Sequence, residues 1–574
     1  MMVGHRSLSD YWARIAREWP TVVIVLLYGV MAATLWPGYH WPVIDAWAFG
    51  YSVKQLVESG RYVFVDWGAM SQLAHVAWGA LFSLPAGFSF GAVNFSTFVL
   101  SLVAMLASYG TLRELSLSPL ASFIGAGPLL VNPAFVLLSY SYMTDVPFLG
   151  WMTLSTWCDV RGLRRQQVGW LAVGSVFATL AVLIRQNGIA LPAALALYLL
   201  WQWARRERSF PWREGLAGVG LPAAALALLT ALSRLEILPG RTNALAWINL
   251  GLVPAQAGAA LFRILLYLGL FTLPLTLAAA PAWVERKGDR LLATVRSLIL
   301  PAVLFLVIGA GAIAQFYHPF KLPYIGTWRM MPYYPSVWSI YGTGSRGEWL
   351  AGEREVVFGP RFWAAITAVS CAGAALLLWP AGRHLLSKFS SRGASFSKGD
   401  SYPTGFLVLI VAAYLGPVLL FKGEIYERYL IGLLIPIAAL VLRAVQRENR
   451  RLFWPAFALV GVIALMFSLA LTAEFVAWNG AAWRAAGRLA AGGVPLYQLD
   501  GGFCWNGWHF AETVRRTNLA PEAGSPAYME LTPQIERRYV VSFSPLNGYV
   551  EVGREPYWSA LHWGQRELWL LRRP

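Results

Sequence analysis

The stretch "SYMTDVPFLG" (residues 141–150) places a carboxylate, Asp145, between two apolar runs at residues 119–139 and 146–158. A charge at membrane depth is costly and is usually kept for a task or paired with an opposite charge. This stretch therefore raises two questions. The first is how the chain crosses a membrane, and the second is what its carboxylate does there.

Composition indicates a membrane protein, because 57% of the 574 residues are apolar and only 13% are charged. Apolar runs of roughly membrane-spanning length predict an all-α polytopic bundle of about 13 transmembrane helices. The runs lie at 20–36, 91–112, 119–139, 146–158, 168–184, 188–203, 215–232, 259–280, 297–315, 360–380, 404–421, 429–443 and 452–474.

The distribution of basic residues predicts the orientation of this bundle. With the N-terminus in the cytoplasm, the inner segments are the N-terminus and the loops after residues 112, 158, 203, 280, 380 and 443. They hold about half of the 46 Lys and Arg residues, as the positive-inside rule expects. The net charge of +17 is thereby explained without nucleic acid as a partner. The chain is predicted to lie in a bacterial inner membrane, surrounded by its lipids.

A further apolar run at 73–88 would reverse every later loop if it crossed the membrane, so it is predicted to be interfacial or re-entrant. The first run lacks a small-residue cleavage site and is expected to be an uncleaved anchor. The outer face then carries a first loop at 37–90 and a long loop at 316–359. Residues 1–474 are predicted to be a catalytic membrane domain, and residues 475–574 a small extracytoplasmic α/β domain.

Asp45 opens the stretch "DAWAFGYSVKQLVESG", whose apolar residues recur at helical spacing and predict an amphipathic helix on the outer membrane surface. An Asp at a helix start is also a common N-cap. Asp145, followed by Pro147, invites the same interpretation. The two acids are therefore either helix caps or a functional pair.

Three features together resemble the GT-C class of integral-membrane glycosyltransferases. They are the outer-face Asp45 before a surface helix, Asp145 in "MTDVP", and "ERYLIGLLIP" opening a late span. The chain is most similar to bacterial members related to protein O-mannosyltransferases and lipid A aminoarabinose transferases, over residues 20–445. The resemblance implies sugar transfer from a polyprenyl-phosphate carrier at the outer face, with inversion. Members often show two adjacent acids where this chain has Asp45 and Ala46.

Such a transfer needs a carboxylate to take a proton and cations to hold the phosphate that leaves. Asp45 is the candidate base, and Asp145 is a second acid that positions the acceptor hydroxyl. Alternatively, the two acids share a divalent metal ion, Mg or Mn. The acceptor itself is a glycan, a lipid or a protein.

Arg428 is the first candidate for the donor phosphate, because it opens a span at the depth of a lipid phosphate and a guanidinium binds phosphate as a fork. Lys422 and Arg185 are candidates of the same kind. The alternative for Arg428 is a helix ion pair with Glu424. Further candidate site residues are Asp66, His318 and Glu427.

Two other classes of protein remain open. A transporter or flippase of a lipid-linked sugar would also use isolated intramembrane charges, but the chain shows no internal repeat. The other alternative is a non-catalytic membrane scaffold whose outer tail binds a partner. An enzyme is expected to gather Asp45, Asp145 and Arg428 in one outward cavity beside a groove that lipid can enter. A transporter is expected to place its charges near the midplane, with paths to both sides.

Overall fold

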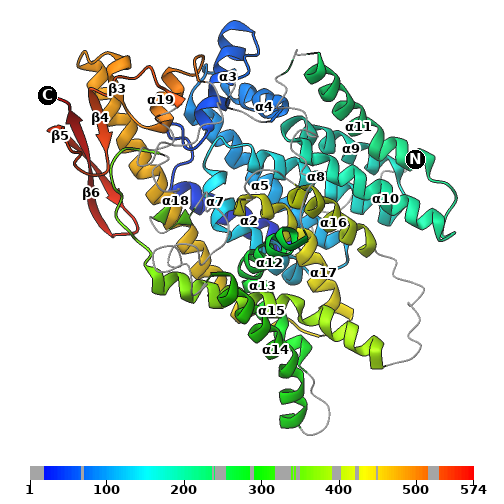
Figure 1. Cartoon of the computed structure of the whole chain (residues 1–574). Helices are drawn as coiled ribbons and strands as arrows, with labels where there is room; N and C mark the ends of the chain where they lie inside the picture. Colours follow the sequence, from blue (N-terminus) through cyan, green and yellow to red (C-terminus); the bar gives the residue numbers. More distant parts are fainter. Residues whose placement is uncertain are drawn as a thin grey trace.

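The computed structural model describes residues 18–65, 67, 70–235, 238, 254–284, 290–316, 338–339, 342–343, 349–390, 403–420, 426–447, 450–514, 529 and 531–574. It is a helical bundle with a small C-terminal sheet (Figure 1). The helices of the first half are α2 (Trp19–Thr34), α3 (Ala46–Ser59), α4 (Leu73–Ser83), α5 (Phe90–Glu114), α6 (Pro119–Leu130), α7 (Pro133–Ser139), α8 (Asp145–Arg165), α9 (Val168–Ile184), η1 (Gln186–Ile189), α10 (Ala190–Ala204) and α11 (Trp212–Arg234).

The second half continues the bundle and ends in the sheet. Its helices are α12 (Pro254–Phe271), α13 (Leu273–Ala279), η4 (Ala280–Trp283), α14 (Arg290–Phe316), α15 (Pro360–Ser390), α16 (Thr404–Leu420), η5 (Glu427–Leu433), α17 (Leu434–Arg447), α18 (Trp454–Ala491), η6 (Leu496–Gln498) and α19 (Phe503–His509). The strands are β1 (Trp338–Ser339), β2 (Gly342–Thr343), β3 (Leu499–Asp500), β4 (Tyr539–Ser542), β5 (Val550–Ser559) and β6 (Gly564–Arg572).

The helices have the length and apolarity of an integral membrane protein. Among the described residues, six helices are long and apolar enough to cross a membrane, or up to eight if each of two bent pairs counts as one span. The predicted helical membrane bundle is therefore confirmed, whereas the number of 13 spans stays a prediction. Helix α4 has only 11 residues, about 16 Å, and is too short to cross a bilayer core of about 30 Å.

One bent pair shows how the sequence breaks a helix inside the membrane part. Helices α6 and α7 meet at an angle of 75°. Between them, the Asn132 Oδ1 accepts hydrogen bonds from the backbone N–H groups of Ala134 and Phe135, and Pro133 occupies the first turn of α7. A cap and a proline at this position start a new helix in a new direction.

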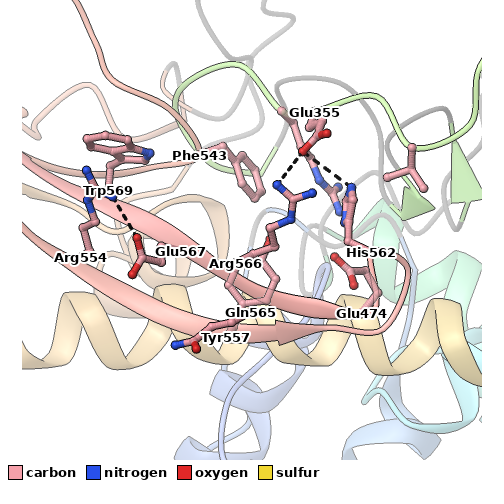
Figure 2. Close-up of a pocket in the computed structure, with 12 residues that line it drawn as sticks. Glu355, Glu474, Phe543, Arg554, Tyr557, His562, Gln565, Arg566, Glu567 and Trp569 are labelled. Atoms are coloured by element: carbon pink, nitrogen blue, oxygen red, sulfur yellow. Dashed lines mark hydrogen bonds and ion pairs between the residues drawn. The ribbon is translucent and has the colours of Figure 1, made fainter.

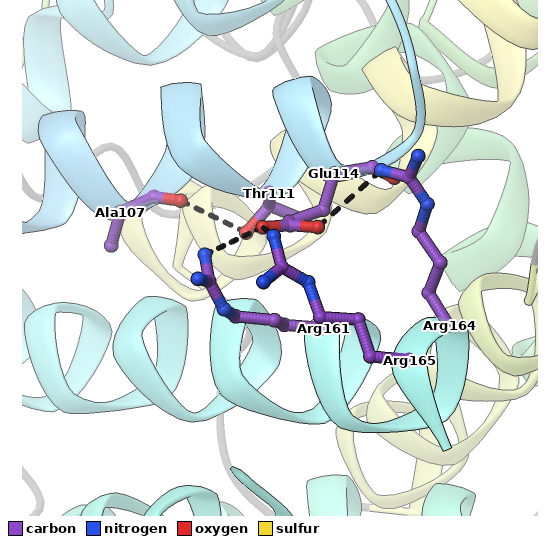
Figure 3. Close-up of polar contacts among 6 residues, drawn as sticks. All are labelled: Ala107, Thr111, Glu114, Arg161, Arg164 and Arg165. Carbon is purple, nitrogen blue, oxygen red and sulfur yellow. Dashed lines mark hydrogen bonds and ion pairs between the residues drawn. The ribbon is translucent and has the colours of Figure 1, made fainter. Parts of the chain in front are cut away.

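The bundle has two distinct ends, and one of them is basic. Figure 3 shows the Glu114 carboxylate, at the end of α5, surrounded by three arginines from the end of α8. The closest contact joins Arg161 Nη1 and Glu114 Oε1 at 2.7 Å, and Arg164 and Arg165 lie at 3.4 and 3.3 Å. Nearby, Arg113 pairs with Glu18 at 2.8 Å. One end of the bundle therefore carries three segments that are predicted to be cytoplasmic. They are the N-terminal segment at Glu18, the loop after Arg113 and the loop after Arg165.

The C-terminal part of the chain contains a small sheet, as an α/β domain requires, and this sheet has four strands in the order β3-β4-β6-β5. Strands β3 and β4 are parallel, and the other pairs are antiparallel. Apolar residues of β4 and β6, including Val541, Leu568 and Leu570, pack against alanines of α18 and form a separate small core. Figure 1 shows this sheet beside α18 and α19.

Helix α18 joins the membrane part to the sheet. Its 38 residues make it about 57 Å long, which exceeds the bilayer core by several turns. It runs without interruption through residue 474, where the sequence predicts the boundary between two domains. Beyond that residue, Arg484 and Arg488 of α18 both pair with the buried Glu555 of β5. The sheet is thus attached to a continuous helix.

We predict opposite locations for the two ends of the bundle. A reporter that is active only in the cytoplasm should give a strong signal when fused in the loop after Arg165 and stay silent when fused at Pro574. The reason is that Lys and Arg accumulate in cytoplasmic loops. Fusions of equal expression should be compared. A strong signal at Pro574 would place the C-terminal sheet in the cytoplasm and refute the orientation.

Candidate functional site

Asp145 is buried at the first residue of α8, and its side chain is only 2% exposed. The residue before it, Thr144, is the N-cap of the helix but makes no side-chain capping hydrogen bond. Pro147 fits the first turn, where a missing N–H is harmless. The positive end of the helix dipole favours a carboxylate at this position. The local sequence thus creates a helix start that accommodates a buried negative charge.

The first partner of Asp145 is Arg185. It lies at the break between α9 and η1, in extended conformation, so its side chain leaves the helix and turns toward α8. Its Nη2 lies 2.8 Å from Asp145 Oδ2. The same guanidinium donates hydrogen bonds to the Thr144 hydroxyl from Nε at 3.0 Å and from Nη2 at 2.8 Å. Arg185 therefore holds the two residues that start α8.

Arg428 approaches the same carboxylate from the other side. It belongs to η5, a 3-10 helix that precedes α17, and it is only 8% exposed. Its Nε lies 3.8 Å from Asp145 Oδ1, and its guanidinium carbon lies 4.9 Å from the Tyr426 ring and 5.7 Å from the Tyr429 ring. Within the described part of the chain, Nε and Nη1 of Arg428 have no hydrogen-bond partner. Buried donors of this kind are suited to an anion.

Asp45 stands at the N-cap position of α3, but its carboxylate does not cap the helix. Instead, Oδ1 accepts a hydrogen bond from the Trp67 indole Nε1–H at 2.8 Å. Asp45 is close enough for its charge to act on Arg428. Since neither Asp45 nor Asp145 makes a side-chain capping bond, the capping interpretation of the two acids does not hold.

The predicted helix after Asp45 is confirmed as α3, but its surroundings differ from the prediction of a helix resting on lipid. Its first half is buried in protein, and Phe49 and Val53 belong to the main core. It packs against α4 and α19, which Figure 1 shows beside it. The apolar spacing of α3 therefore reflects contact with protein on that side.

The other candidates are less informative. Glu427 is fully buried next to Arg428. Three of the candidates lie outside the described residues: Asp66, His318 and Lys422. The same is true of Glu424 and of most of the long loop at 316–359.

Sequence reasoning missed Thr144, Trp67 and the two tyrosines that flank Arg428. The tyrosines stand directly in "IYERY", where aromatic residues beside an arginine are a readable signal for a cation–π contact.

The donor set does not suit a divalent cation held by both acids. Among the described residues, no group of three or more His, Cys, Asp or Glu side chains is placed to bind a metal ion. The two oxygens of Asp145 face the guanidinium groups of Arg185 and Arg428. A cation shared by Asp45 and Asp145 would have to compete with these two charges.

The site is thus a buried carboxylate between two arginines, with a second carboxylate nearby, at the end of the bundle opposite Glu114. Helix α8 separates Asp145 from Arg165 by about 30 Å. This arrangement is suited to hold an anionic group beside a proton acceptor. Residues 76–234 match the family model for dolichyl-phosphate-mannose-protein mannosyltransferase, and this segment includes Asp145 and Arg185. The match confirms the resemblance to GT-C class membrane glycosyltransferases.

Solved structures of two proteins are similar to the chain at low identity. ArnT from Cupriavidus metallidurans, bound to undecaprenyl phosphate, is 12% identical, with 96% of this chain and 97% of that chain covered and a TM-score of 0.40. The oligosaccharyltransferase of Archaeoglobus fulgidus, in complex with Zn and sulfate, is 14% identical, with 91% and 67% covered and a TM-score of 0.45. No curated protein matches the sequence.

We predict a stronger energetic coupling between Asp145 and Arg185 than between Asp145 and Arg428, because the two pairs are separated by 2.8 and 3.8 Å. Removing one partner of a buried ion pair commonly costs roughly 3–5 kcal/mol. The measurement is a pair of double-mutant cycles on thermal unfolding in detergent, using Asp145→Asn with Arg185→Gln and with Arg428→Gln.

Equal coupling in both cycles would show that the two arginines share the carboxylate evenly. No coupling in either cycle would mean that the ion pairs do not form.

Proposed function

We propose that the chain is a glycosyltransferase that moves a sugar from a polyprenyl-phosphate donor to an acceptor hydroxyl at the outer face of the membrane, with inversion. The observation that carries this proposal is the buried Asp145 between Arg185 and Arg428. The family model matched by residues 76–234 is named for a sugar carried on a polyprenyl phosphate, which supports the class of donor.

Arg428 binds the donor phosphate in this proposal. A phosphate takes up the Nε and Nη1 donors that lack partners among the described residues. Arg185 contributes its charge from the other side of Asp145. Together they stabilise the phosphate as it leaves the sugar, because preorganised cations in a dry site act strongly on developing charge. Lys422 stays a further candidate for the same role.

Asp45 acts as the base. It takes the proton of the acceptor hydroxyl, whose oxygen attacks the anomeric carbon as the bond between that carbon and the phosphate oxygen breaks. The electron pair of the broken bond leaves with the phosphate. A single displacement of this kind inverts the anomeric carbon. Asp145 fixes the two arginines and positions the acceptor. The guanidinium groups supply the positive charge, so the scheme requires no divalent cation.

The position of the site at one end of the bundle supports an enzyme over a transporter, whose charges are expected near the midplane. The cluster of Arg161, Arg164 and Arg165 around Glu114 at the opposite end supports an outward orientation of the site. In this proposal the C-terminal sheet is extracytoplasmic. The direct test gives the purified protein a panel of polyprenyl-phosphate sugars with candidate acceptors and measures the release of polyprenyl phosphate. Transport of the lipid-linked sugar across vesicles without release would support a flippase instead.

We predict that Asp45→Asn lowers kcat on the order of a hundredfold, as loss of acid–base help commonly does. Its fold should be kept, because Asn retains an oxygen that can accept from Trp67. Asp145→Asn should lower kcat as well, but also the thermal midpoint, because it leaves two buried arginines without their carboxylate. Turnover and thermal unfolding are measured for each variant.

Asp159→Asn is the matched control, since Asp159 is a second buried acid of α8 near the basic end. It should leave kcat near the parent value.

The double variant of Asp45 and Asp145 should lose little kcat beyond the worse single variant, because the effects of residues that act as one unit are not additive. Near-normal turnover in Asp45→Asn would remove Asp45 from the role of base.

We also predict that Arg428→Ala raises the KM for the lipid donor much more than the KM for the acceptor. Arg428→Lys should recover only part of the loss, because the fork of two donors is absent. Arg447→Ala is the control, since Arg447 is exposed at the far end of α17. If Arg428→Ala raised the KM for both substrates equally, Arg428 would not bind the donor phosphate. Its role would then be the structural contact with Asp145.

A further inference from the structure

A second polar cavity lies in the C-terminal part of the protein, away from the Asp45–Asp145 site. It has a volume of about 540 Å³ and lies between the β5–β6 hairpin, the segment 354–357 and α18 (Figure 2). This volume is in the range of pockets that bind small ligands. None of the residues that line it belongs to the site described above.

The charges in this pocket are balanced. Three arginines and three glutamates line it: Arg354, Arg554, Arg566, Glu355, Glu474 and Glu567. Figure 2 shows two of the resulting pairs, which join Arg566 Nη1 to Glu355 Oε2 and Arg554 Nη1 to Glu567 Oε2, each at 3.0 Å. A site for phosphate or carboxylate would carry an excess of cations. The balance favours a neutral ligand.

Aromatic rings orient the arginines. The guanidinium carbon of Arg554 lies 4.0 Å from the Trp569 ring, and that of Arg354 lies 5.0 Å from Trp478 and 5.1 Å from Phe543. A guanidinium stacked on a ring keeps its edge for hydrogen bonds. The cavity thus presents guanidinium donors next to carboxylate acceptors, as in the pairs of Arg566 with Glu355 and of Arg554 with Glu567. A sugar offers hydroxyl groups that donate and accept at once, so neighbouring hydroxyls satisfy both kinds of group.

The wall formed by α18 is rigid. Glu474 is only 2% exposed, and its Oε2 accepts hydrogen bonds from the Ser559 hydroxyl at 2.7 Å and from the Leu561 backbone N–H at 3.3 Å. The Ser559 oxygen also lies 2.8 Å from Nδ1 of His562. These contacts tie α18 to the turn between β5 and β6. The pocket is therefore formed before a ligand arrives, which reduces the entropy lost on binding.

A continuous set of aromatic contacts connects the pocket wall with Asp45. Phe475, next to Glu474, packs against Trp349 with ring centroids 6.1 Å apart. Trp349 packs against Phe503 at 5.2 Å, and Phe503 against Trp67 at 5.6 Å. Trp67 donates to Asp45. The pocket and the proposed base thus lie at the same end of the protein and share one packed wall.

We propose that this pocket binds a neutral saccharide and holds the glycan part of the acceptor. The assignment to the acceptor rests on the proposed function, whereas the binding of a neutral saccharide does not. Binding energy from a part of the substrate remote from the reacting hydroxyl positions the hydroxyl at Asp45.

The test measures binding to the full chain in nanodiscs by saturation-transfer difference NMR. The probes are mannobiose, maltotriose and chitotriose as neutral saccharides, glucose 6-phosphate as an anionic sugar, and a Ser/Thr-rich peptide. At least one neutral saccharide should bind, and Arg566→Ala and Gln565→Ala should weaken its binding about tenfold or more. Arg572→Ala is the matched control, because it removes an exposed arginine from the same strand outside the pocket.

Asp45→Asn separates this proposal from the proposed function. It should bind the saccharide like the parent, even if turnover is lost. In the parent background, Arg566→Ala should raise the KM for a saccharide-bearing acceptor about tenfold while hydrolysis of the donor by water is unchanged. Saccharide binding without any glycosyl transfer by the parent would refute the acceptor role and the proposed function but keep the pocket.

Three results would overturn the saccharide pocket. They are no binding by any neutral probe, binding of only the phosphorylated sugar or the peptide, and equal weakening by Arg572→Ala. The last result would show that the loss comes from the sheet as a whole.

Discussion

The buried contact of Asp145 with two arginines is the constraint on which one end of the bundle depends. Each of these charges loses most of its hydration, and a partner is needed to offset that loss. The partners come from distant parts of the chain, since Arg185 follows α9 and Arg428 precedes α17. The contact therefore fixes three segments around one point.

Every charge of the site sits where a helix starts or ends. Asp45 and Asp145 stand at the starts of α3 and α8, Arg185 at the end of α9, and Arg428 in the 3-10 turn before α17. In the middle of a membrane helix the backbone is satisfied and the side chain faces lipid or a neighbour. At a helix end, backbone dipoles and extended backbone let a charged side chain turn into the protein. The breaks between helices are thus the places where the protein accommodates the charged side chains of the candidate site.

The cost of intramembrane charge is what allowed the site to be predicted from the sequence. Asp145, Arg185 and Arg428 stand out in apolar surroundings, and their order along the chain resembles a known class. The pairing of Asp145 with Arg185, rather than with its own helix start, depends on how α8 and α9 pack, and single-sequence patterns do not report such contacts. The sequence also does not report that α18 continues through residue 474. The composition changes at this residue, but the helix does not end there.

The membrane part and the C-terminal part of the chain are in close contact near Asp45, for a physical reason. Helix α19, from the C-terminal part, rests on α3, and a Cβ at Gly507 would come within 2.4 Å of the Trp47 ring. Only glycine permits this approach. Trp47 follows Asp45 by two residues and packs edge-on against Phe503 of α19. The position of Asp45 therefore depends on residues more than 450 positions away, so the C-terminal part acts as a structural wall of the candidate site.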